Sequence, residues 1–162
     1  MKKNLHKTPQ HKKKGGKPQL PNTTDVMTPA QRSRCMSNIR GSDTGPELRF
    51  RRLLWKQGLR YRLGYKKIPG KPDIVLVSAR IAIFIDGCFW HSCPLHATKP
   101  KANSSFWKTK LKNNIERDRL VNSGLRENGW RVIRLWEHEI ENDLQSAVRR
   151  TVAFFRRKRK RL

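Results

Sequence analysis

Side chains that can bind metals or transfer protons are concentrated between residues 86 and 96, directly after an apolar run. Within this segment Cys88, Cys93 and His96 have the spacing C-x4-C-x2-H. Thiolates and imidazoles are the ligands that Zn²⁺ takes in tetrahedral protein sites. A closed structural site needs four ligands, and His138 is the best-placed fourth because it follows the next predicted strand. The sequence therefore predicts a zinc site, with free thiols and surface histidines as the alternative.

Two aspartates are expected near this segment, at the ends of neighbouring strands. Asp73 begins an apolar run after a turn that contains Pro and Gly, and Asp86 ends the next apolar run. Two carboxylates that converge there need a cation between them, or one of them must hold a proton. Oxygen ligands of this kind suit Mg²⁺. The alternative is that Asp73 satisfies backbone donors of its turn and that Asp86 is a turn residue before Gly87.

The zinc prediction leaves over one histidine and three aromatic residues. His91 is not needed as a zinc ligand, and an imidazole near Asp73 can act as a general base for a water nucleophile. The aromatic residues are Phe89, Trp90 and Trp107. In a basic protein such rings can wedge between base steps or stack on bases. Ordinary packing around the zinc loop is the other interpretation of these rings.

The composition points to a polyanionic partner. The 162 residues suffice for one domain with one core, and 38 Lys and Arg against 12 Asp and Glu give a net charge of +26. A surface this basic attracts nucleic acid and releases its counterions. No apolar run approaches the roughly 20 residues that span a bilayer, and the basic N-terminus lacks the apolar segment of a secretory signal. Three cysteines do not suggest a disulfide framework, so we expect a cytoplasmic protein.

Three parts of the chain differ in composition. Residues 1–24 contain seven lysines and no acidic residue, which predicts a flexible basic tail. Six consecutive cations begin at Arg156, so residues 156–162 are predicted to form a second basic tail. Without these two sets of cations the central part, residues 25–155, still has a net charge of +13. The predicted folded domain is therefore basic in its own right.

Capping signals and periodicity predict an α/β fold. Thr28-Pro-Ala-Gln31 and Thr44-Gly-Pro-Glu47 are capping boxes, and each should open a helix. The predicted elements are, in order, a helix over 28–40, a helix from Thr44 ended by Gly58, a short strand over 59–63, a hairpin of strands over 73–77 and 80–85, a helix over 104–128, a strand over 130–136 and a helix from Asp143. This order implies a mixed β-sheet with helices packed against it.

Several of these motifs together resemble a known family. The motifs that carry the likeness are Pro72-Asp73, Phe84-Ile-Asp-Gly-Cys-Phe-Trp-His91, Phe106-Trp107, Asn114-Ile-Glu-Arg-Asp118 with Arg119, Gly129-Trp-Arg-Val132 and Trp136-Glu137. Through them the chain resembles the very short patch repair (Vsr) DNA mismatch endonucleases. The likeness extends from about Thr28 to about His138, and both basic tails lie outside it.

The resemblance implies a restriction-endonuclease-like mixed β-sheet core flanked by helices, with a structural zinc. It also implies an enzyme that uses Mg²⁺ to nick one strand of duplex DNA beside a T:G mismatch, the product of deaminating 5-methylcytosine. By position, Asp73 matches the metal-binding aspartate, His91 the catalytic histidine and Glu47 a supporting acid of the active site. The acid-x-lysine pair of the wider nuclease fold is absent; the family replaces it with the histidine and a backbone carbonyl, by position that of Ile85. The role of Asp86 stays open.

The resemblance also implies a DNA-facing surface. Phe89, Trp90 and Trp107 match aromatic residues that wedge into the duplex, and Asn114 and Asp118 match polar residues that face the DNA one helical turn apart. We expect a monomer that binds double-stranded DNA with a T:G mismatch at the nucleoid in the cytoplasm. Other DNA repair proteins are expected to act after it has made the nick. Two other classes remain: a zinc-stabilised nucleic-acid-binding module without catalysis, and a restriction-type nuclease that cuts intact sites.

Overall fold

The computed structural model describes residues 27–101 and 103–159. The N-terminal tail predicted over residues 1–24 and the last three residues of the chain lie outside the described residues. Helix α5 (Leu144–Arg159) extends into the predicted C-terminal tail. The run of six cations therefore begins as the last part of a helix.

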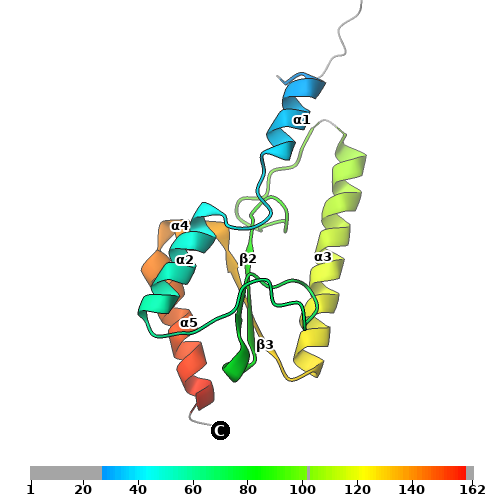
Figure 1. The fold of residues 1–162 in the computed structure, drawn as a ribbon. Coiled ribbons are helices and arrows are strands. Elements are labelled where there is room, and N and C mark those ends of the chain that lie inside the picture. The colour runs from blue at the N-terminus through cyan, green and yellow to red at the C-terminus, as the bar shows by residue number, and fades with distance from the viewer. Residues whose placement is uncertain (1–26, 102, 160–162) are drawn as a thin grey trace, which may run out of the picture.

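A three-stranded sheet lies between helices on both of its faces (Figure 1). Its strand order is β1 (Ile74–Leu76), β2 (Ile81–Asp86) and β3 (Arg131–Trp136). Strands β1 and β2 are antiparallel and are joined by the 3-10 turn η1 (Val77–Ala79), whereas β2 and β3 are parallel. The central hairpin and the mixed sheet predicted from the sequence are therefore confirmed.

Both predicted capping boxes lie where helices begin. At the start of helix α1 (Pro29–Ser37), the Thr28 hydroxyl accepts from the backbone N–H of Gln31 over 3.2 Å, and the Gln31 side chain accepts from the Thr28 N–H over 2.8 Å. At the start of α2 (Gly45–Lys56), the Glu47 carboxylate accepts from the N–H of the residue before the helix over 3.4 Å. These bonds satisfy N–H groups that a helix leaves without intrahelical partners.

The short strand predicted over residues 59–63 is wrong. In the structure this segment forms only an isolated bridge between Arg62 and Val75. Leu59 is buried in the core, but the chain turns soon afterwards at Gly64, whose φ is 56°. The extended run therefore ends after a single residue pair has reached the sheet.

A helix that was not predicted, α4 (Glu137–Asn142), follows β3 directly. Its start is held by Glu139, whose Oε2 atom accepts from the backbone N–H of Trp136 over 2.9 Å. Burial opposes ionisation of Glu139, but this hydrogen bond and the charge of Arg150 outweigh it and lower the pKa of the carboxyl. Ile140 of the same helix is buried in the core. The capped start and the buried Ile140 explain why a helix forms here.

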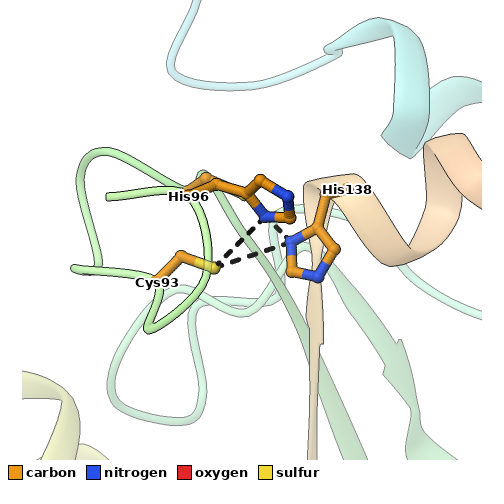
Figure 2. A group of neighbouring side chains, drawn as sticks. Cys93, His96 and His138 are labelled. Atoms are coloured by element: carbon orange, nitrogen blue, oxygen red, sulfur yellow. Dashed lines mark hydrogen bonds between the residues drawn. The ribbon is translucent and has the colours of Figure 1, made fainter. Parts of the chain in front are cut away.

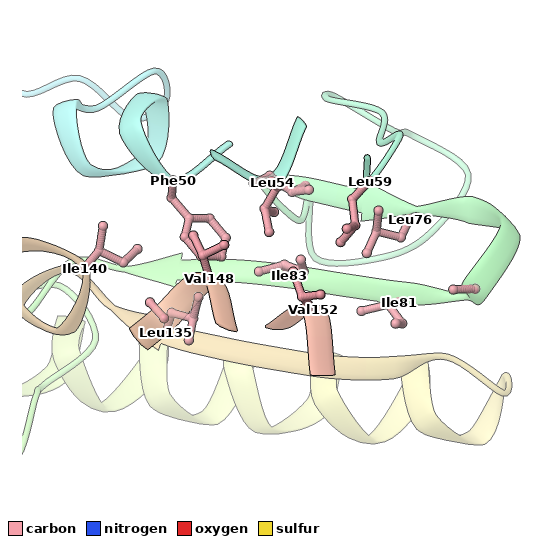
Figure 3. Close-up of a cluster of buried hydrophobic side chains, with 13 residues drawn as sticks. Phe50, Leu54, Leu59, Leu76, Ile81, Ile83, Leu135, Ile140, Val148 and Val152 are labelled. Carbon is pink, nitrogen blue, oxygen red and sulfur yellow. The ribbon is translucent and has the colours of Figure 1, made fainter. Parts of the chain in front are cut away.

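The main core lies on the sheet face that α2, α4 and α5 cover (Figure 3). Ile81 and Ile83 of β2 point to this face together with Leu135 of β3, because alternate residues of a strand share a face. They pack against residues from the helices, from strand β1 and from the segment after α2: Phe50, Leu54, Leu59, Leu76, Ile140, Ala147, Val148 and Val152. Each fully buried side chain of this size stabilises the fold by about 1.5–3 kcal/mol. This core holds the sheet to its helices.

Helix α3 (Ser104–Glu127) covers the opposite face and connects the parallel strands β2 and β3. Parallel strands need such a crossover, since a tight turn cannot join them. The apolar contact on this side is a smaller cluster of Ala82, Phe84 and Leu125. Although α3 has 24 residues, neither it nor another helix in residues 27–101 and 103–159 is long and apolar enough to cross a membrane.

The turn before β1 approaches α3 closely at Gly70. The φ of Gly70 is 84°, a conformation that residues with a Cβ atom rarely adopt. A Cβ atom at this position would overlap the Cγ1 atom of Val121 and lie 3.3 Å from the ring of Phe84. The same turn leads to Asp73, so this close approach helps to place that carboxylate.

We expect Gly70→Ala to lower the free energy of unfolding by about 2–4 kcal/mol, because it combines a strained positive φ with overlap against α3. Gly124→Ala is the matched control: nothing lies within 4 Å of its Cβ position in α3, and alanine there should stabilise by up to about 1 kcal/mol. Urea unfolding followed by circular dichroism measures both changes. Equal stability of Gly70→Ala and the unmodified protein would show that the turn can move away from α3 at no cost.

Candidate active site and metal-binding cluster

Asp73 lines a pocket of about 650 Å³ that residues at the end of the sheet share. Its Oδ2 atom accepts a hydrogen bond of 2.7 Å from the backbone N–H of Ile85, which fixes the carboxylate beside β2. Burial raises the pKa of Asp73 to about 6; the Ile85 N–H acts in the opposite direction, and the charges of Glu47 and Asp86 add to the increase. The pocket therefore contains a carboxylate whose ionisation costs free energy unless a cation compensates it.

Glu47 lines the same pocket from the first turn of α2, and its side chain is buried. One carboxylate oxygen accepts from the backbone N–H of Thr44, and the other accepts from Arg51 over 3.1 Å. Arg51 is itself held by Asp43 at 2.5 Å. The capping contact and the place in the pocket coexist, so the geometry is compatible with both roles predicted for Glu47.

His91 lines this pocket from the loop after β2. Its Nδ1 atom is 2.5 Å from the Oδ2 atom of Asp118 in α3. Burial opposes ionisation of Asp118, but the hydrogen bond from His91 and the charge of Arg134 outweigh it and lower the pKa of the carboxyl. An ionised carboxylate can only accept, so the proton of the neutral imidazole lies on Nδ1 and Nε2 is left as an acceptor. This is the tautomer that a general base requires.

Asp86 is buried and paired with Arg134, and it does not line the pocket that holds Asp73. The Nε and Nη2 atoms of Arg134 donate to the two carboxylate oxygens of Asp86, each over 2.6 Å. Burial opposes the charge on Arg134, but Asp86 and Asp118 outweigh it and raise the pKa of the guanidinium above its ordinary value. The acid whose role the sequence left open is thus one half of a buried ion pair.

Cys88, Cys93, His96 and His138 come together in the structure. One ligand atom from each of them lies within 4.8 Å of all the others. The Nδ1 atom of His138 is 3.1 Å from the Cys88 sulfur and 3.6 Å from the Cys93 sulfur. Figure 2 shows Cys93 and the two imidazoles pointing toward one another. Burial raises the pKa of the Cys88 thiol and the neighbouring Cys93 adds to the increase, so the Cys88 thiol ionises readily only beside a cation. The group can therefore hold a metal ion.

The loop after β2 is wound so that its side chains reach two different partners. The N–H of Cys93 donates to the Cys88 carbonyl over 2.9 Å, and the N–H of Ala97 donates to the Cys93 carbonyl over 2.9 Å. Ser92, between His91 and Cys93, has a φ of 54°. Within a few residues the loop therefore directs the cysteines toward His138 in α4 and His91 toward α3.

Phe89, Trp90 and Trp107 pack against one another. The ring of Phe89 lies edge-on, 5.1 Å from Trp90 and 5.2 Å from Trp107 between centroids. All three residues are partly buried, whereas the adjacent Phe106 is 59% exposed. Packing of these rings is the alternative that the sequence left open, and their insertion into DNA stays a prediction.

Asn114 and Asp118 both have partners inside the protein. Asn114 is 8% exposed, and its side-chain amide donates to the Trp90 carbonyl over 2.9 Å. Asp118 contacts His91 and two arginines. Their spacing on α3 does place them on one side of the helix, but that side supports the loop and the His91 ring. The DNA-facing role that the resemblance implies for them stays a prediction.

Arg134 and Met36 were not identified from the sequence. The available signal for Arg134 was a charged residue inside an apolar strand, because a buried charge needs a partner. Met36 of α1 lines the pocket together with Ile39, and their exposed fractions are 38% and 49%. No local pattern could mark Met36 or Ile39, since their place depends on how α1 and the segment after it lie relative to the sheet.

Known proteins share much of this chain. A family model described as DNA mismatch endonuclease Vsr matches residues 24–96. The chain is 48% identical over 124 residues to the type II nicking enzyme V.NaeI of Lentzea aerocolonigenes, which covers 74% of this chain and 75% of that protein. It is 43% identical over 121 residues to the type II nicking enzyme V.NmeAIP of Neisseria meningitidis, covering 74% and 86% respectively. It is also 43% identical over 114 residues to DNA mismatch endonuclease Vsr of Escherichia coli, covering 70% and 73%.

We expect Asp73→Asn to stabilise the protein above pH 6 in buffer without added divalent cations. The pKa of Asp73 is raised from 3.8 to about 6, so the folded state favours the protonated carboxyl. That contribution is complete below the unfolded-state pKa and is lost as the pH rises through about 6. Asparagine never ionises and keeps an oxygen for the Ile85 N–H, so the variant should gain about 1–3 kcal/mol at pH 8 and markedly less at pH 4.5.

Urea unfolding at the two pH values measures this gain. Asp143→Asn, at an aspartate on the surface, is the control and should change the stability little at either pH. A gain of equal size at pH 4.5 and pH 8 would contradict a buried carboxylate whose charge destabilises the fold.

Proposed function

The chain belongs to the Vsr family of DNA mismatch endonucleases, hydrolases of phosphodiester bonds, and we propose that it uses Mg²⁺ to nick one strand of duplex DNA beside a T:G mismatch. One pocket brings together Asp73, Glu47 and His91, whose Nδ1 atom is paired with Asp118, and this arrangement carries the proposal. Membership in a family of endonucleases argues against a binding module without catalysis. It also implies that the mixed sheet and its helices are the restriction-endonuclease-like core of that family.

Oxygen donors in the pocket suit Mg²⁺. The proposed ligands are the Asp73 carboxylate and the backbone carbonyl of Ile85, with Glu47 as a supporting acid, and all three residues line the pocket. The pKa of Asp73 near 6 supports a cation here, because a positive charge beside this carboxyl favours its ionised form at neutral pH. Mg²⁺ held by these residues would polarise the scissile phosphate and stabilise the leaving oxygen.

His91 is the proposed base for the attacking water. Its Nδ1 atom is held by Asp118, so the free Nε2 atom takes the proton from a water molecule in the pocket. The Asp118 carboxylate then stabilises the imidazolium that forms, in the way that an aspartate supports the histidine of a catalytic triad. The proposed catalytic residues are therefore Asp73 and His91, with Glu47 beside them.

We propose Zn²⁺, in a structural role, for the cluster of Cys88, Cys93, His96 and His138. Two thiolates and two imidazoles make a closed tetrahedral set, which leaves no position for a substrate. Three of these residues lie in the loop after β2, and the fourth lies in α4. Zinc there would tie the loop that carries His91 to the end of the sheet.

Basic side chains beside the pocket suit the phosphate backbone. A second pocket of about 540 Å³ also includes Asp73 and Glu47, and it is lined by Arg51, Lys66 and Lys71. Cations that neutralise phosphates release counterions, so the affinity for DNA should fall as the salt concentration rises. The scissile phosphate can be held here within reach of both carboxylates.

The choice of a mismatch is proposed to come from the aromatic cluster. Phe89, Trp90 and Trp107 lie next to His91 in the chain or pack on residues that do, so rings inserted into the duplex would sit beside the scissile phosphate. A mismatched step costs less to unstack than a paired one, and deformability then gives selectivity. Asn114 and Asp118 of α3 would support this cluster through their contacts with Trp90 and His91.

A restriction-type nuclease that cuts intact sites is the remaining alternative. V.NaeI and V.NmeAIP are named nicking enzymes, which favours cleavage of one strand. We also propose that the protein acts as a monomer at the nucleoid in the cytoplasm, where its substrate lies, and that other repair proteins process the nick.

A labelled duplex with T:G or C:G at one position tests the proposed activity. We expect a nick in one strand of the T:G duplex when Mg²⁺ is present, and none when Mg²⁺ is omitted. His91→Ala should slow the nick by about 10²–10⁴-fold, because it removes the base. Asp73→Ala should abolish it through loss of the metal ligand, whereas Asp143→Asn at the surface should leave it unchanged.

Two results would contradict these expectations. Cleavage of both strands in the C:G duplex would favour the restriction-type alternative. An Asp73→Ala variant that nicks at the normal rate would exclude the proposed Mg²⁺ site.

Metal analysis of the purified protein tests the zinc proposal. We expect about one Zn²⁺ per chain, and we expect Cys93→Ser to lower both the zinc content and the unfolding temperature, because metal binding contributes folding free energy. Cys35→Ser, at an exposed cysteine in α1, is the matched control and should keep the metal. A zinc content near zero in the unmodified protein would overturn the assignment.

A further inference from the structure

Strands β2 and β3 carry an ion pair between buried Asp86 and partly buried Arg134 that the proposed reaction does not use. Asp86 is 4% exposed, and Arg134 donates a hydrogen bond of 2.6 Å to each of its carboxylate oxygens. Taking two charges out of water costs several kcal/mol per ion, so such a pair is weak evidence for stability. The pair lies on the sheet face that α3 covers, since Arg134 is opposite Phe84 in the register and Asp86 is two residues further along β2.

The guanidinium of Arg134 reaches beyond Asp86 to the catalytic pair. Its Nη2 atom is 3.2 Å from Oδ2 of Asp118, the same oxygen that contacts His91. Its Nη1 atom donates to the side chain of Asn122 over 3.3 Å, and its central carbon lies 4.8 Å above the ring of Phe84. The guanidinium is therefore held by Asp86, by α3 and by an aromatic ring, and its Nη2 atom also lies near Asp118 and 3.4 Å from Nδ1 of His91.

We propose that Arg134 is a positioning residue for this nuclease: anchored by Asp86, it holds Asp118 in the orientation that presents Nε2 of His91 to the attacking water. Asp86 then serves to fix the guanidinium and does not bind Mg²⁺. This inference rests on the proposed role of His91 as the base.

No other described contact of Asp118 can replace this one. Arg117 also contacts Asp118, but through the other carboxylate oxygen at 3.1 Å, and its side chain is 59% exposed. An exposed cation contributes little and is screened by salt. A lysine at position 134 would be a point charge and could not grip Asp86 at two atoms while reaching Asp118. The planar fork of arginine is thus what links the two carboxylates.

The competing interpretation is that Arg134 only neutralises Asp86. The double variant Asp86→Asn/Arg134→Gln separates the two, because it leaves two neutral side chains where removal of Arg134 alone would strand a buried carboxylate. If Arg134 positions Asp118, the double variant nicks DNA more slowly than the unmodified protein. If Arg134 only neutralises Asp86, the double variant nicks at the rate of the unmodified protein.

Single-turnover nicking of the T:G duplex, with protein in excess, measures the effect on the chemical step. We expect the double variant to nick about 10–100-fold more slowly, as expected when a reacting group is slightly misplaced. Its affinity for the duplex, measured by fluorescence anisotropy without Mg²⁺, should change by less than about twofold, since the Arg134 side chain is 21% exposed and its described contacts are with other side chains of the protein. Asp143→Asn/Arg149→Gln, which removes an exposed pair at 4.0 Å, is the matched control and should nick at the full rate.

Nuclear magnetic resonance of ¹⁵N-histidine-labelled protein gives a readout that does not depend on nicking. The proton between His91 Nδ1 and Asp118 should give a strongly downfield signal in the unmodified protein, and we expect the double variant to lose it. A double variant that keeps this signal overturns the inference, whatever its nicking rate. If the unmodified protein shows the signal but does not nick the T:G duplex, the proposed function fails, and the inference is still decided by the signal.

Discussion

The parallel register between β2 and β3 determines where the polar groups of this protein meet. In that register Asp86 lies opposite Trp136. Two residues further along each chain, Cys88 and His138 approach to 3.1 Å and begin the metal-binding cluster. Arg134, two residues before Trp136 on β3, reaches forward along the sheet to Asp86. A slip of one residue between the strands would turn Arg134 to the face of the sheet opposite Asp86, because side chains alternate along a strand.

The strand end also separates the acidic groups into two environments. On the α3 face, Asp86 and Asp118 share the charge of Arg134, and the pKa of Asp118 is lowered. In the pocket, Asp73 has the backbone N–H of Ile85 as its hydrogen-bond donor, and its pKa rises to about 6. Asp86 and Asp118 are thus stabilised by a cation of the protein itself, whereas the ionised form of Asp73 can be stabilised by an external cation. A chain with a net charge of +26 thus leaves a carboxylate uncompensated at the place where we propose that Mg²⁺ binds.

Much of the fold and part of the site could be predicted from the sequence. Capping boxes at Thr28 and Thr44 and the β-branched runs of the hairpin are local signals, and the structure follows them. The sequence predicted a strand over residues 59–63 that does not form, and it did not predict α4. Both outcomes depend on residues distant in the chain. Residues 59–63 make only a single bridge to the sheet, whereas α4 is held by burial of Ile140 and by the contact between Arg150 and Glu139. Asn114 and Asp118 were assigned outward roles by resemblance, but only the packing of α3 on the loop shows that both side chains have partners inside.

By itself the sequence determined the chemistry that is available: a C-x4-C-x2-H ligand set, a histidine beside it, acids at two strand ends and a strongly basic chain. These properties depend on residue type and short spacing, so they can be read without coordinates. Only the tertiary structure decided which acid is free to act. Asp73 and Asp86 look alike in the sequence, one at the start and one at the end of an apolar run. In the structure Asp86 pairs with Arg134, 48 residues away in the chain, while Asp73 faces the pocket. Ion pairing and burial are set by groups that lie side by side in space, and the fold brings those groups together from distant parts of the chain.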